Sequence, residues 1–496
     1  MKFLIINSIF IIYFVHTFLR YKKSLHMLQL NSYKNDRYLK WLNKNLKKAL
    51  MLFYKSEPQK KPFVVTDRIK RLYITFTIIF FTLNILLNIS TSILIPIIIL
   101  VLINFGIYFV TIPINAINSI VENHINKGFY NKAKNKVKDM KNLKVVGITG
   151  SYGKTSTKYI INNILTQKYQ TLMTPESYNT TMGVTKTINN DLKSIDQVFV
   201  CEMGAKNAGD IKEICDLVSP KFGIITSIGE QHLETFKTLE NVKKTKFELA
   251  DSIPDDGIVF LNYNDINIRN MNYKKKNIIK YGIMKEAQDN IEFDYWAENI
   301  ILNEKGTTFD FCSKSGKNVR LSTKLLGTHN ICNIVGASAI ACEMNLNQNE
   351  ISIGVKTLKP VPHRLEVKAN PNGYIVIDDA YNSNPIGSKM ALEVLNSFEG
   401  YKKLIITPGM IELGDKQELY NKQFGEYISN VCDFTILVGK NQTKPIQEGL
   451  KNKGYSNDKI YIASDLNDAI QKMDSIVKGD KCVILFENDL TDDYLE

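Results

Sequence analysis

The chain has 496 residues, 44% of them hydrophobic, which is typical of two or three domains with well-formed cores. Its seven cysteines are odd in number and include no C-x-x-C pair, a pattern that indicates reduced, buried thiols rather than disulfides or zinc ligands. The net charge of +13 comes almost entirely from residues 20–71, which hold fifteen Lys and Arg against three Asp and Glu, and this localisation argues against nucleic acid as a partner.

Residues 1–142 are predicted to form a membrane anchor. Residues 3–19 are an apolar run of minimal span length, and basic residues follow at once. A cleaved signal peptide is the alternative, but no small-x-small cleavage site follows the run. Residues 72–121 contain no Asp, Glu, Lys or Arg, so we expect a transmembrane hairpin with spans at about 72–91 and 93–112. A hairpin buried in a soluble core is the alternative.

The basic segment, residues 20–71, is expected to stay in the cytoplasm, because short loops rich in Lys and Arg remain on that side. This orientation places residue 1 outside and everything after about residue 115 inside. It predicts a multi-pass protein of the cell membrane whose domains after about residue 115 lie in the cytoplasm. Residues 39–54 mix apolar residues and lysines at helical spacing, which favours an interfacial helix on anionic lipid. A solvated basic face is the alternative.

From Lys144 onward, short apolar strands alternate with helices, which predicts an α/β fold with a doubly wound central domain. Strands are expected at 145–148, 197–201, 222–228 and 258–262, with helices from Lys154, Asp210 and Val242. Residues 278–325 change to short alternating segments that predict an antiparallel side sheet. A second series of strands, at 374–377, 404–406, 434–438, 459–462 and 482–486, predicts a Rossmann-like C-terminal domain. The expected domains are 1–142, 143–357 and 358–496.

The stretch from Lys144 to Lys158, KVVGITGSYGKTSTK, combines a β-branched run, a glycine-rich turn and the start of a helix. Backbone N–H groups at a helix N-terminus bind phosphate oxygens, and glycines let the chain approach them. Lys154 is then expected to reach the β- and γ-phosphates, and the Thr155 hydroxyl to hold Mg²⁺. The strict pattern G-x-x-x-x-G-K-[ST] requires glycine at 148, where this chain has Ile148, so the loop is a variant. A glycine-rich turn with a solvated lysine is the alternative.

Two more polar side chains follow predicted strands, at the edge where open α/β sheets bind ligands. Glu202 ends the strand in VFVCEMGA, and His232 follows the strand in FGIITSIGEQH. A carboxylate, a neutral imidazole and the Thr155 hydroxyl beside phosphates suit Mg²⁺, which takes few protein ligands and keeps waters. Taken singly, Glu202 could equally pair with a lysine, and His232 could be an ordinary loop histidine.

Nine blocks between residues 147 and 415 resemble the Mur ligase family, in the order in which the family has them, and are most like its MurF-type members. The blocks are GITGSYGKTSTK, TPESYNTTMGVTKTIN, CEMGAKNAGDI, ITSIGEQHLETF, NVKKTKFELA, LLGTHNICNIVGASAIA, PVPHRLEV, IDDAYNSNP and GMIELGD. The resemblance implies a ligase that uses ATP and Mg²⁺ to turn a carboxylate into an acyl phosphate, which an amine then attacks. The implied substrates are a carboxylate-bearing cell-envelope precursor and an amino acid or dipeptide.

The same resemblance implies roles for individual residues. The implied nucleotide contacts are Gly150, Ser151, Tyr152, Gly153, Lys154, Thr155 and Ser156, with Asn330 at the adenine, Asp379 at the ribose and Arg364 at the γ-phosphate. The implied metal ligands are Thr155, Glu202, His232 and Lys246, the last as a carbamate. Lys154, Lys246 and Arg364 would act in catalysis, and Asn179 and Thr180 would face the substrate. Since Arg364 and Asp379 lie in the C-terminal domain, that domain is expected to close over ATP.

Two departures from the family bear on the substrate. MurF-type enzymes begin with a soluble domain that grips a UDP-sugar, and here the predicted anchor takes its place. The C-terminal segment FENDLTDDYLE lacks the Lys-Gly-Ser-type loop of the family. Two other interpretations stay open: a membrane-bound ligase that makes a γ-glutamyl-type polymer, and a nucleotide-binding membrane scaffold without catalysis. The presence of Glu202, His232, Lys246 and Arg364 together argues against the scaffold.

Overall fold

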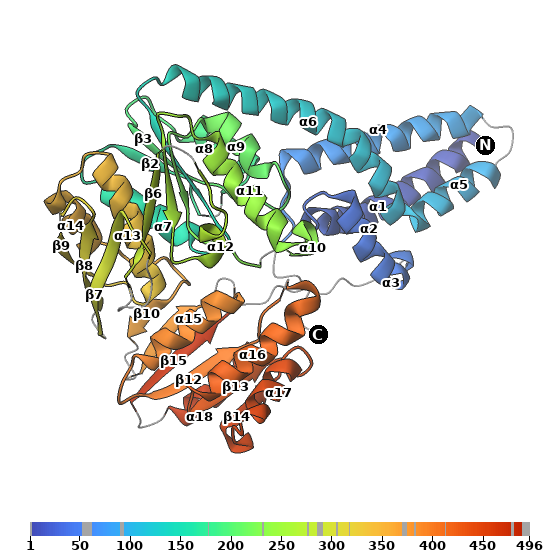
Figure 1. Ribbon diagram of the computed structural model, residues 1–496. Coiled ribbons are helices and arrows are strands. Elements are labelled where there is room, and N and C mark those ends of the chain that lie inside the picture. Colours follow the sequence, from blue (N-terminus) through green and yellow to red (C-terminus); the bar gives the residue numbers. More distant parts are fainter. Residues whose placement is uncertain are drawn as a thin grey trace. The chain divides into compact units, whose positions relative to one another are not determined.

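A computed structural model of the chain divides into two compact units, Met1–Gly128 and Phe129–Glu496 (Figure 1). The structure describes residues 2–51, 62–89, 94–176, 178–230, 233–274, 277–284, 291–303, 306–316, 318–369, 374–380, 383–411, 413–477 and 481–488. Helix α6 carries the chain from the first unit into the second.

The first unit is a bundle of helices: α1 (Lys2–Leu30), α2 (Asn35–Lys44), α3 (Leu46–Leu50), α4 (Asp67–Ile89), α5 (Leu94–Phe105) and the first part of α6 (Ile107–Asp139). Its core is rich in aromatic rings, and Phe14 of α1 packs against Phe76 and Phe80 of α4. Large apolar side chains also cover its outside, for example Ile12 at 69% and Ile85 at 65% exposure. Helices that are apolar on all sides are typical of bundles surrounded by an apolar medium.

The predicted spans are only partly matched by these helices. Among the described residues, one helix, over Asp67–Leu86, is long and apolar enough to cross a bilayer. A second exists only if Ile97–Phe105 and Ile107–Asp139, which meet at 83°, form one broken span. The predicted span over 93–112 is therefore not one straight helix, and its crossing of a membrane stays a prediction. The helix ends at Phe105 because Gly106, a poor helix former, stands at the bend.

Two other predicted segments of the first unit differ in extent. Residues 3–19 form only the first part of α1, a 29-residue helix that continues through the basic residues after Leu19. The predicted interfacial helix at 39–54 is split into α2 and α3, and residues 52–54 lie outside the described part of the chain. Helix α2 turns one face into the bundle, because Tyr38 is buried and its hydroxyl lies 2.6 Å from Ser24 Oγ.

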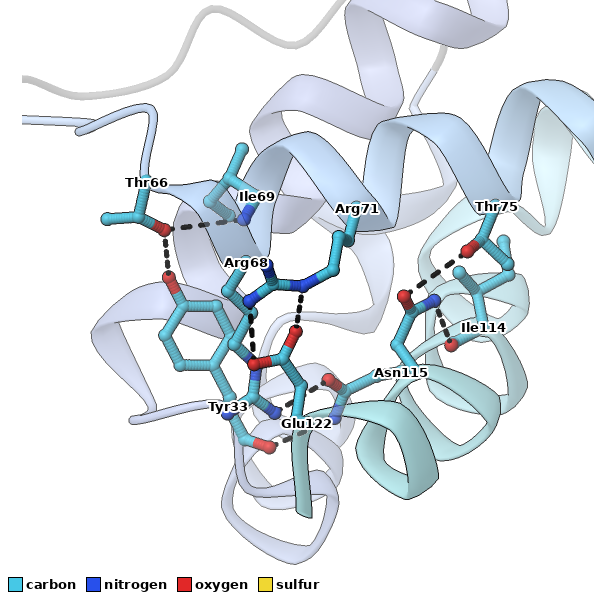
Figure 2. A network of polar contacts seen from close by, with 10 residues as sticks. Tyr33, Thr66, Arg68, Ile69, Arg71, Thr75, Ile114, Asn115 and Glu122 are labelled. Carbon is cyan, nitrogen blue, oxygen red and sulfur yellow. Dashed lines mark hydrogen bonds and ion pairs between the residues drawn. The ribbon is translucent and has the colours of Figure 1, made fainter. Parts of the chain in front are cut away.

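A polar network joins the start of α4 to the middle of α6 (Figure 2). Arg71 binds the buried carboxylate of Glu122 through two hydrogen bonds, Nε to Oε1 at 2.5 Å and Nη2 to Oε2 at 2.9 Å. The guanidinium of Arg68 stacks over the ring of Tyr33 at 4.1 Å and donates to Asn115 Oδ1 at 3.3 Å. Charged and amide groups thus gather at the end of the apolar helix α4 where the candidate span begins.

The second unit begins with a nine-stranded sheet in the order β2-β3-β1-β4-β5-β6-β7-β8-β9. Its strands are β1 (Lys144–Thr149), β2 (Thr171–Met173), β3 (Val198–Glu202), β4 (Phe222–Ile225), β5 (Ile258–Asn262), β6 (Ile278–Ile283), β7 (Tyr295–Asn303), β8 (Gly306–Ser313) and β9 (Val319–Thr323). Strands β1 to β7 pair in parallel, and β7, β8 and β9 pair antiparallel. The predicted doubly wound fold is confirmed. The antiparallel strands, however, extend the main sheet through β6, which is parallel to β5, instead of forming a sheet of their own.

Helices cover both faces of this sheet (Figure 1). One core contains residues of α7 (Lys154–Leu165), α13 (Thr328–Glu343) and α14 (Gln348–Lys356). The other contains residues of the end of α6, α8 (Thr181–Asn190), α9 (Asp210–Val218) and α11 (Leu239–Ser252). The short helices α10 (Leu233–Phe236) and α12 (Ile266–Arg269) lie in connections between strands. This layering leaves the carboxyl ends of β1, β3 and β4 side by side, where ligands bind in such sheets.

A second sheet of six strands follows, in the order β10-β11-β15-β12-β13-β14. Its strands are β10 (Glu366–Ala369), β11 (Ile375–Asp379), β12 (Lys402–Thr407), β13 (Phe434–Val438), β14 (Ile460–Ala463) and β15 (Cys482–Glu487), and its helices are α15 (Pro385–Asn396), α16 (Gln417–Ser429), α17 (Lys444–Asn452) and α18 (Leu466–Ile476). A short 3-10 turn at Gly414–Lys416 precedes α16, and another at Asn457–Lys459 precedes β14. All neighbours are parallel except β10 and β11, as the Rossmann-like prediction requires.

Candidate active site

The predicted phosphate-binding loop lies between β1 and α7. Ile148 is fully buried within β1, so the position where the strict pattern requires glycine belongs to the core. The turn itself starts at Gly150, whose φ is +151°, and a Cβ there would lie 2.1 Å from Thr226 Oγ1. Gly153, at φ +79°, precedes α7 and supplies no capping side chain. The first N–H groups of α7 therefore remain available for an anion.

Hydrogen bonds to the segment after β4 hold this loop in place. Ser151 N donates to Ser227 O at 2.7 Å, and Tyr152 N donates to Ser227 Oγ at 3.0 Å. The Thr226 hydroxyl donates to Tyr152 O at 2.5 Å. The loop is thus shaped by its neighbours before any ligand arrives, which lowers the entropic cost of binding a phosphate chain.

Lys154, the first residue of α7, folds back across the loop. Its Nζ donates to Gly150 O at 2.7 Å and to Ser151 O at 2.9 Å. Burial lowers the pKa of Lys154 to about 8, and the Glu202 carboxylate opposes that change. A phosphate oxygen is a stronger acceptor for an ammonium group than a carbonyl, so an entering phosphate chain would replace these contacts.

Glu202 ends β3 beside this loop and is 1% exposed. Its Oε1 accepts hydrogen bonds from the Thr155 hydroxyl at 3.2 Å and from Asn179 Nδ2 at 3.0 Å. The structure therefore brings together three predicted site residues from a helix, a strand and a loop. Hydroxyl and carboxylate oxygens next to a phosphate loop are the donors that Mg²⁺ prefers.

Lys158 is a site residue that the sequence reasoning missed. It is fully buried, and its Nζ lies 3.1 Å from Glu202 Oε2 and donates to Glu176 O. Burial lowers the pKa of Lys158, and Glu202 opposes this. The signal was present in the block GKTSTK, since Lys158 follows Lys154 by four residues and shares its helix face. Lys158 fixes the second oxygen of Glu202 and ties it to the loop that carries Asn179.

Lys246 lies on α11 and is only 2% exposed. Burial lowers the pKa of Lys246 well below its usual value, and the nearby charge of Lys154 lowers it further. Among the residues that the structure describes, none accepts a hydrogen bond from its ammonium group. Lys246 is thus buried, whereas Lys244 on the same helix is exposed. A neutral amine is the form of lysine that reacts with CO₂ to give a carbamate.

The predicted adenine contact, Asn330, lies in the first turn of α13 and is buried. Its Nδ2 donates to Leu326 O at 2.8 Å, which leaves Oδ1 as the group that can accept from a ligand. Burial lowers the pKa of the neighbouring His329 to about 4, so its imidazole is neutral. Asn333, one turn further, touches the phosphate loop, because a Cβ on Gly153 would lie 3.2 Å from Asn333 Oδ1. Helix α13 therefore borders the loop.

Arg364 and Asp379 come from the segment that contains the second sheet. Asp379 ends β11, and its Oδ1 accepts a hydrogen bond from Leu365 N at 3.2 Å. Burial raises the pKa of Asp379 to about 6, against the effects of the Leu365 N–H and of the Arg364 charge. Arg364 also lowers the pKa values of Lys154 and Lys158, which places its charge within electrostatic range of the phosphate loop.

Two family models match the second unit. The Mur ligase middle domain matches residues 148–341, and a model described as Mur ligase, glutamate ligase domain, matches residues 363–486. Together these ranges cover more than half of the chain. The chain belongs to the Mur ligase family. As a Mur ligase, it is an ATP-dependent enzyme that forms an amide bond.

Individual relatives agree with this assignment. The UDP-N-acetylmuramoyl-tripeptide–D-alanyl-D-alanine ligase of Bacillus subtilis strain 168 is 28% identical over 347 residues, which cover 69% of this chain and 72% of that protein. The protein of the same name from Escherichia coli K12 is 30% identical over 298 residues, which cover 60% and 65%. The crystal structure of MurF ligase from Thermotoga maritima in complex with ADP superimposes with a TM-score of 0.65 and 26% identity, covering 73% of this chain and 80% of that one.

Three predicted site residues of this Mur ligase remain to be placed. Thr180 caps α8, because its side chain accepts from Gly183 N at 3.2 Å, so its hydroxyl oxygen already has a structural partner. Ser156 lies half-buried in the first turn of α7. His232 lies outside the described residues, so of the second predicted metal site only Lys246 is described.

Proposed function

We propose that this Mur ligase joins the carboxylate of a muramoyl-tripeptide precursor to the amine of D-alanyl-D-alanine, with ATP as the energy source. The observation that carries the proposal is the contact of the Thr155 hydroxyl with the buried Glu202 beside the phosphate loop. The choice of substrates is supported by the names of the relatives that are 28% and 30% identical.

The reaction has two steps. The precursor carboxylate attacks the γ-phosphorus of ATP, which gives an acyl phosphate and ADP; the amine then attacks the acyl carbon, and phosphate leaves with formation of the amide and loss of a proton. Phosphoryl transfer needs positioning and charge neutralisation more than proton transfer. We assign these tasks to the N–H groups that follow Gly153, to Lys154 and to Arg364. Asn330 and Asp379 would hold the nucleoside, and Asn179 would orient the precursor.

The residues at the loop fit Mg²⁺. No group of three or more His, Cys, Asp or Glu side chains gathers anywhere in the described ranges, so the chain offers a hydroxyl and a carboxylate rather than a full protein cage. This is the donor set of a Mg²⁺ that takes its other ligands from phosphates and water. Thr155 and Glu202 would hold it, and when bound it neutralises charge on the phosphate oxygens. A carbamate on Lys246 and the imidazole of His232 would hold a second ion.

We further propose that the first unit attaches the enzyme to a membrane with the second unit in the cytoplasm. The exposed apolar side chains of α1, α4 and α5 support this, for example Ile12, Ile78 and Leu94 at 69%, 60% and 65% exposure. Residues 20–71, with their excess of Lys and Arg, would meet anionic lipid. Apolar helices and a basic segment together bind lipid more strongly than either does alone.

The test of the ligase proposal is phosphate release by the purified full-length protein with ATP and pairs of candidate substrates. UDP-N-acetylmuramoyl-tripeptide with D-alanyl-D-alanine should release phosphate. The mass spectrum should show a product heavier than the precursor by the mass of one dipeptide minus one water. Products that grow by successive glutamate units would establish the γ-glutamyl polymer instead. Nucleotide binding without phosphate release from any pair would establish the scaffold.

Lys154→Ala is the control variant for that assay. It should lower turnover by at least about 100-fold, because a charge aimed at the transferred phosphoryl group is lost. Its thermal unfolding midpoint should match that of the parent, since Lys154 contacts loop carbonyls and not the core. Phosphate release at the parental rate would remove this loop from the mechanism.

A further inference from the structure

Glu230 connects the phosphate-binding loop with the second sheet domain. It follows β4 in the nine-stranded sheet, whereas its partners lie far along the chain, 186 and 190 residues away. Its Oε1 lies 2.6 Å from Lys416 Nζ, and its Oε2 accepts from the Tyr420 hydroxyl at 2.6 Å. Lys416 ends the turn before α16, and Tyr420 lies in the first turns of α16. One carboxylate thus holds two side chains of the C-terminal segment.

The backbone of Glu230 reaches the loop on its other side. Glu230 O accepts a hydrogen bond from the Tyr152 hydroxyl at 2.9 Å, and Tyr152 lies in the loop itself, two residues before Lys154. The neighbouring Gly229 is joined to the loop as well, because its N–H donates to Ser151 Oγ at 3.0 Å. The ring of Tyr152 lies close to Gly229, since a Cβ there would come within 2.5 Å of it. These contacts join the backbone at Gly229 and Glu230 to the phosphate-binding loop.

The charges make this connection stronger than an ordinary surface ion pair. Burial alone would raise the pKa of Glu230, but Lys416 and Tyr420 more than offset it, so the pKa of Glu230 is lowered. The side chain of Glu230 is 21% exposed, compared with 48% for Lys416. Two hydrogen bonds to one ionised carboxylate, one of them from a cation, are roughly twice as strong as neutral ones.

We infer that Glu230 is a positioning residue that couples docking of the C-terminal domain, through Lys416 and Tyr420, to the phosphate-binding loop, through Tyr152. In this arrangement the domain that supplies Arg364 is held in place by the same residue that supports the loop under the phosphates. Removing either side of the connection lowers the fraction of enzyme in which loop and domain are correctly placed together. The inference rests on the proposed binding of ATP at this loop.

The experiment compares four variants in phosphate release and in nucleotide binding. Two of them break the contact to α16: the single variant Glu230→Gln and the double variant Lys416→Met/Tyr420→Phe. Tyr152→Phe keeps that contact but breaks the one to the loop. Lys422→Met is the matched control, because Lys422 lies on the same helix and pairs with Glu448 at 3.7 Å instead. Binding is measured with a fluorescent ATP analogue and no acceptor, so this readout does not depend on which substrates are ligated.

We expect turnover at saturating ATP to fall by about 10-fold in Glu230→Gln, in the Lys416/Tyr420 double variant and in Tyr152→Phe, with weaker binding of the analogue. An isolated exposed ion pair would account for no more than about fivefold. The control should stay within about twofold of the parent. Unfolding midpoints without nucleotide should be the same in all variants. Turnover of the double variant Glu230→Gln/Tyr152→Phe should be no lower than that of the weaker single variant, because both substitutions interrupt the same connection.

Charge reversal gives an independent readout. Glu230→Lys and Lys416→Glu should each lose activity, and the two together should recover part of it. The inference is overturned if the Glu230 and Tyr152 variants work at the parental rate, if their effects multiply, or if their unfolding midpoints fall without nucleotide. A dead Lys154→Ala beside normal Glu230 variants would overturn this inference alone, whereas an active Lys154→Ala would overturn the proposed function.

Discussion

At the scale of single residues, Lys246 is the position where the structure sharpens the chemistry most. An ammonium group would repel a metal ion, so a lysine in a metal site needs to be neutral or to carry CO₂ as an anionic carbamate. Lys246 is 2% exposed, and its surroundings lower its pKa well below the usual value. Burial thus favours the neutral amine, which is the reactive form. We keep the carbamate as a proposal for this chain.

Lys246→Ala should lower phosphate release by about 100-fold, as loss of an essential charged group does. Added acetate or formate should raise phosphate release by this variant several-fold, because the added carboxylate fills the vacant anionic position. Lys244→Ala on the same helix is the control, since Lys244 is exposed, and it should behave as the parent. Full activity of Lys246→Ala, or a rescue by acetate that the parent shows equally, would refute the carbamate.

At the scale of elements, two carboxylates lie next to each other where β11 and β15 end. Asp379 and Glu487 are register partners on these parallel strands. Glu487 is buried and accepts hydrogen bonds from the hydroxyls of Ser383 and of Thr407, the latter at 2.8 Å. Burial raises the pKa of Glu487 to about 7, and the charge of Asp379 adds to the effect of burial. Glu487 lies at the end of β15, close to where the Lys-Gly-Ser-type loop of the family was expected.

A raised carboxyl pKa means that the folded protein binds this proton more tightly than the unfolded chain. The stability contributed by protonated Glu487 is fully present below the ordinary pKa of 4.5 and is lost as the pH rises through about 7. Glu487→Gln, which mimics the protonated form, should therefore raise the free energy of unfolding at pH 8 by up to about 3 kcal/mol and change little at pH 4. Denaturant unfolding at both pH values measures this. Equal effects at pH 4 and pH 8 would show that folding does not raise the pKa of Glu487.

At the scale of the whole molecule, the first unit lies outside the residues that the family models match. The matched family models begin at residue 148, and the helices before it expose many large apolar side chains, such as Ile12 and Ile85. The proposed membrane attachment would account for this exposure, and the Arg71–Glu122 ion pair lies at the end of α4 where the candidate span begins.

The chain should therefore sediment with membranes and resist alkaline extraction, and a fluorescent reporter fused after Glu496 should be active in the cytoplasm. Ile78→Lys combined with Ile85→Lys in α4, where both side chains are exposed, should release the protein, because charges in the bilayer core cost about 2.5–3.5 kcal/mol each. Ile353→Lys, at an exposed position on α14 of the second unit, is the control. A reporter active only outside the cell would contradict the proposed orientation. Recovery of the unmodified protein in the soluble fraction would contradict membrane attachment.

The sequence alone determined the features that depend on local pattern. Alternating apolar strands and helices predicted both α/β domains, and the helix after Gly153 and the strand that ends at Glu202 lie where the sequence predicted them. These features could be read because strand and helix periodicity and glycine turns act over a few neighbouring residues. Hydropathy did not reveal the bend at Gly106, because a bend leaves the composition of the segment unchanged.

Only the tertiary structure decided which distant residues meet. Lys158 reaches Glu202 across 44 positions of sequence, Glu230 reaches Lys416 across 186, and Lys246 alone among its neighbouring lysines turns inward. No local signal specifies such contacts, because they depend on how helices and sheets pack against one another. Burial then sets the charge states of these groups, since desolvation acts on a side chain only after the rest of the chain has enclosed it.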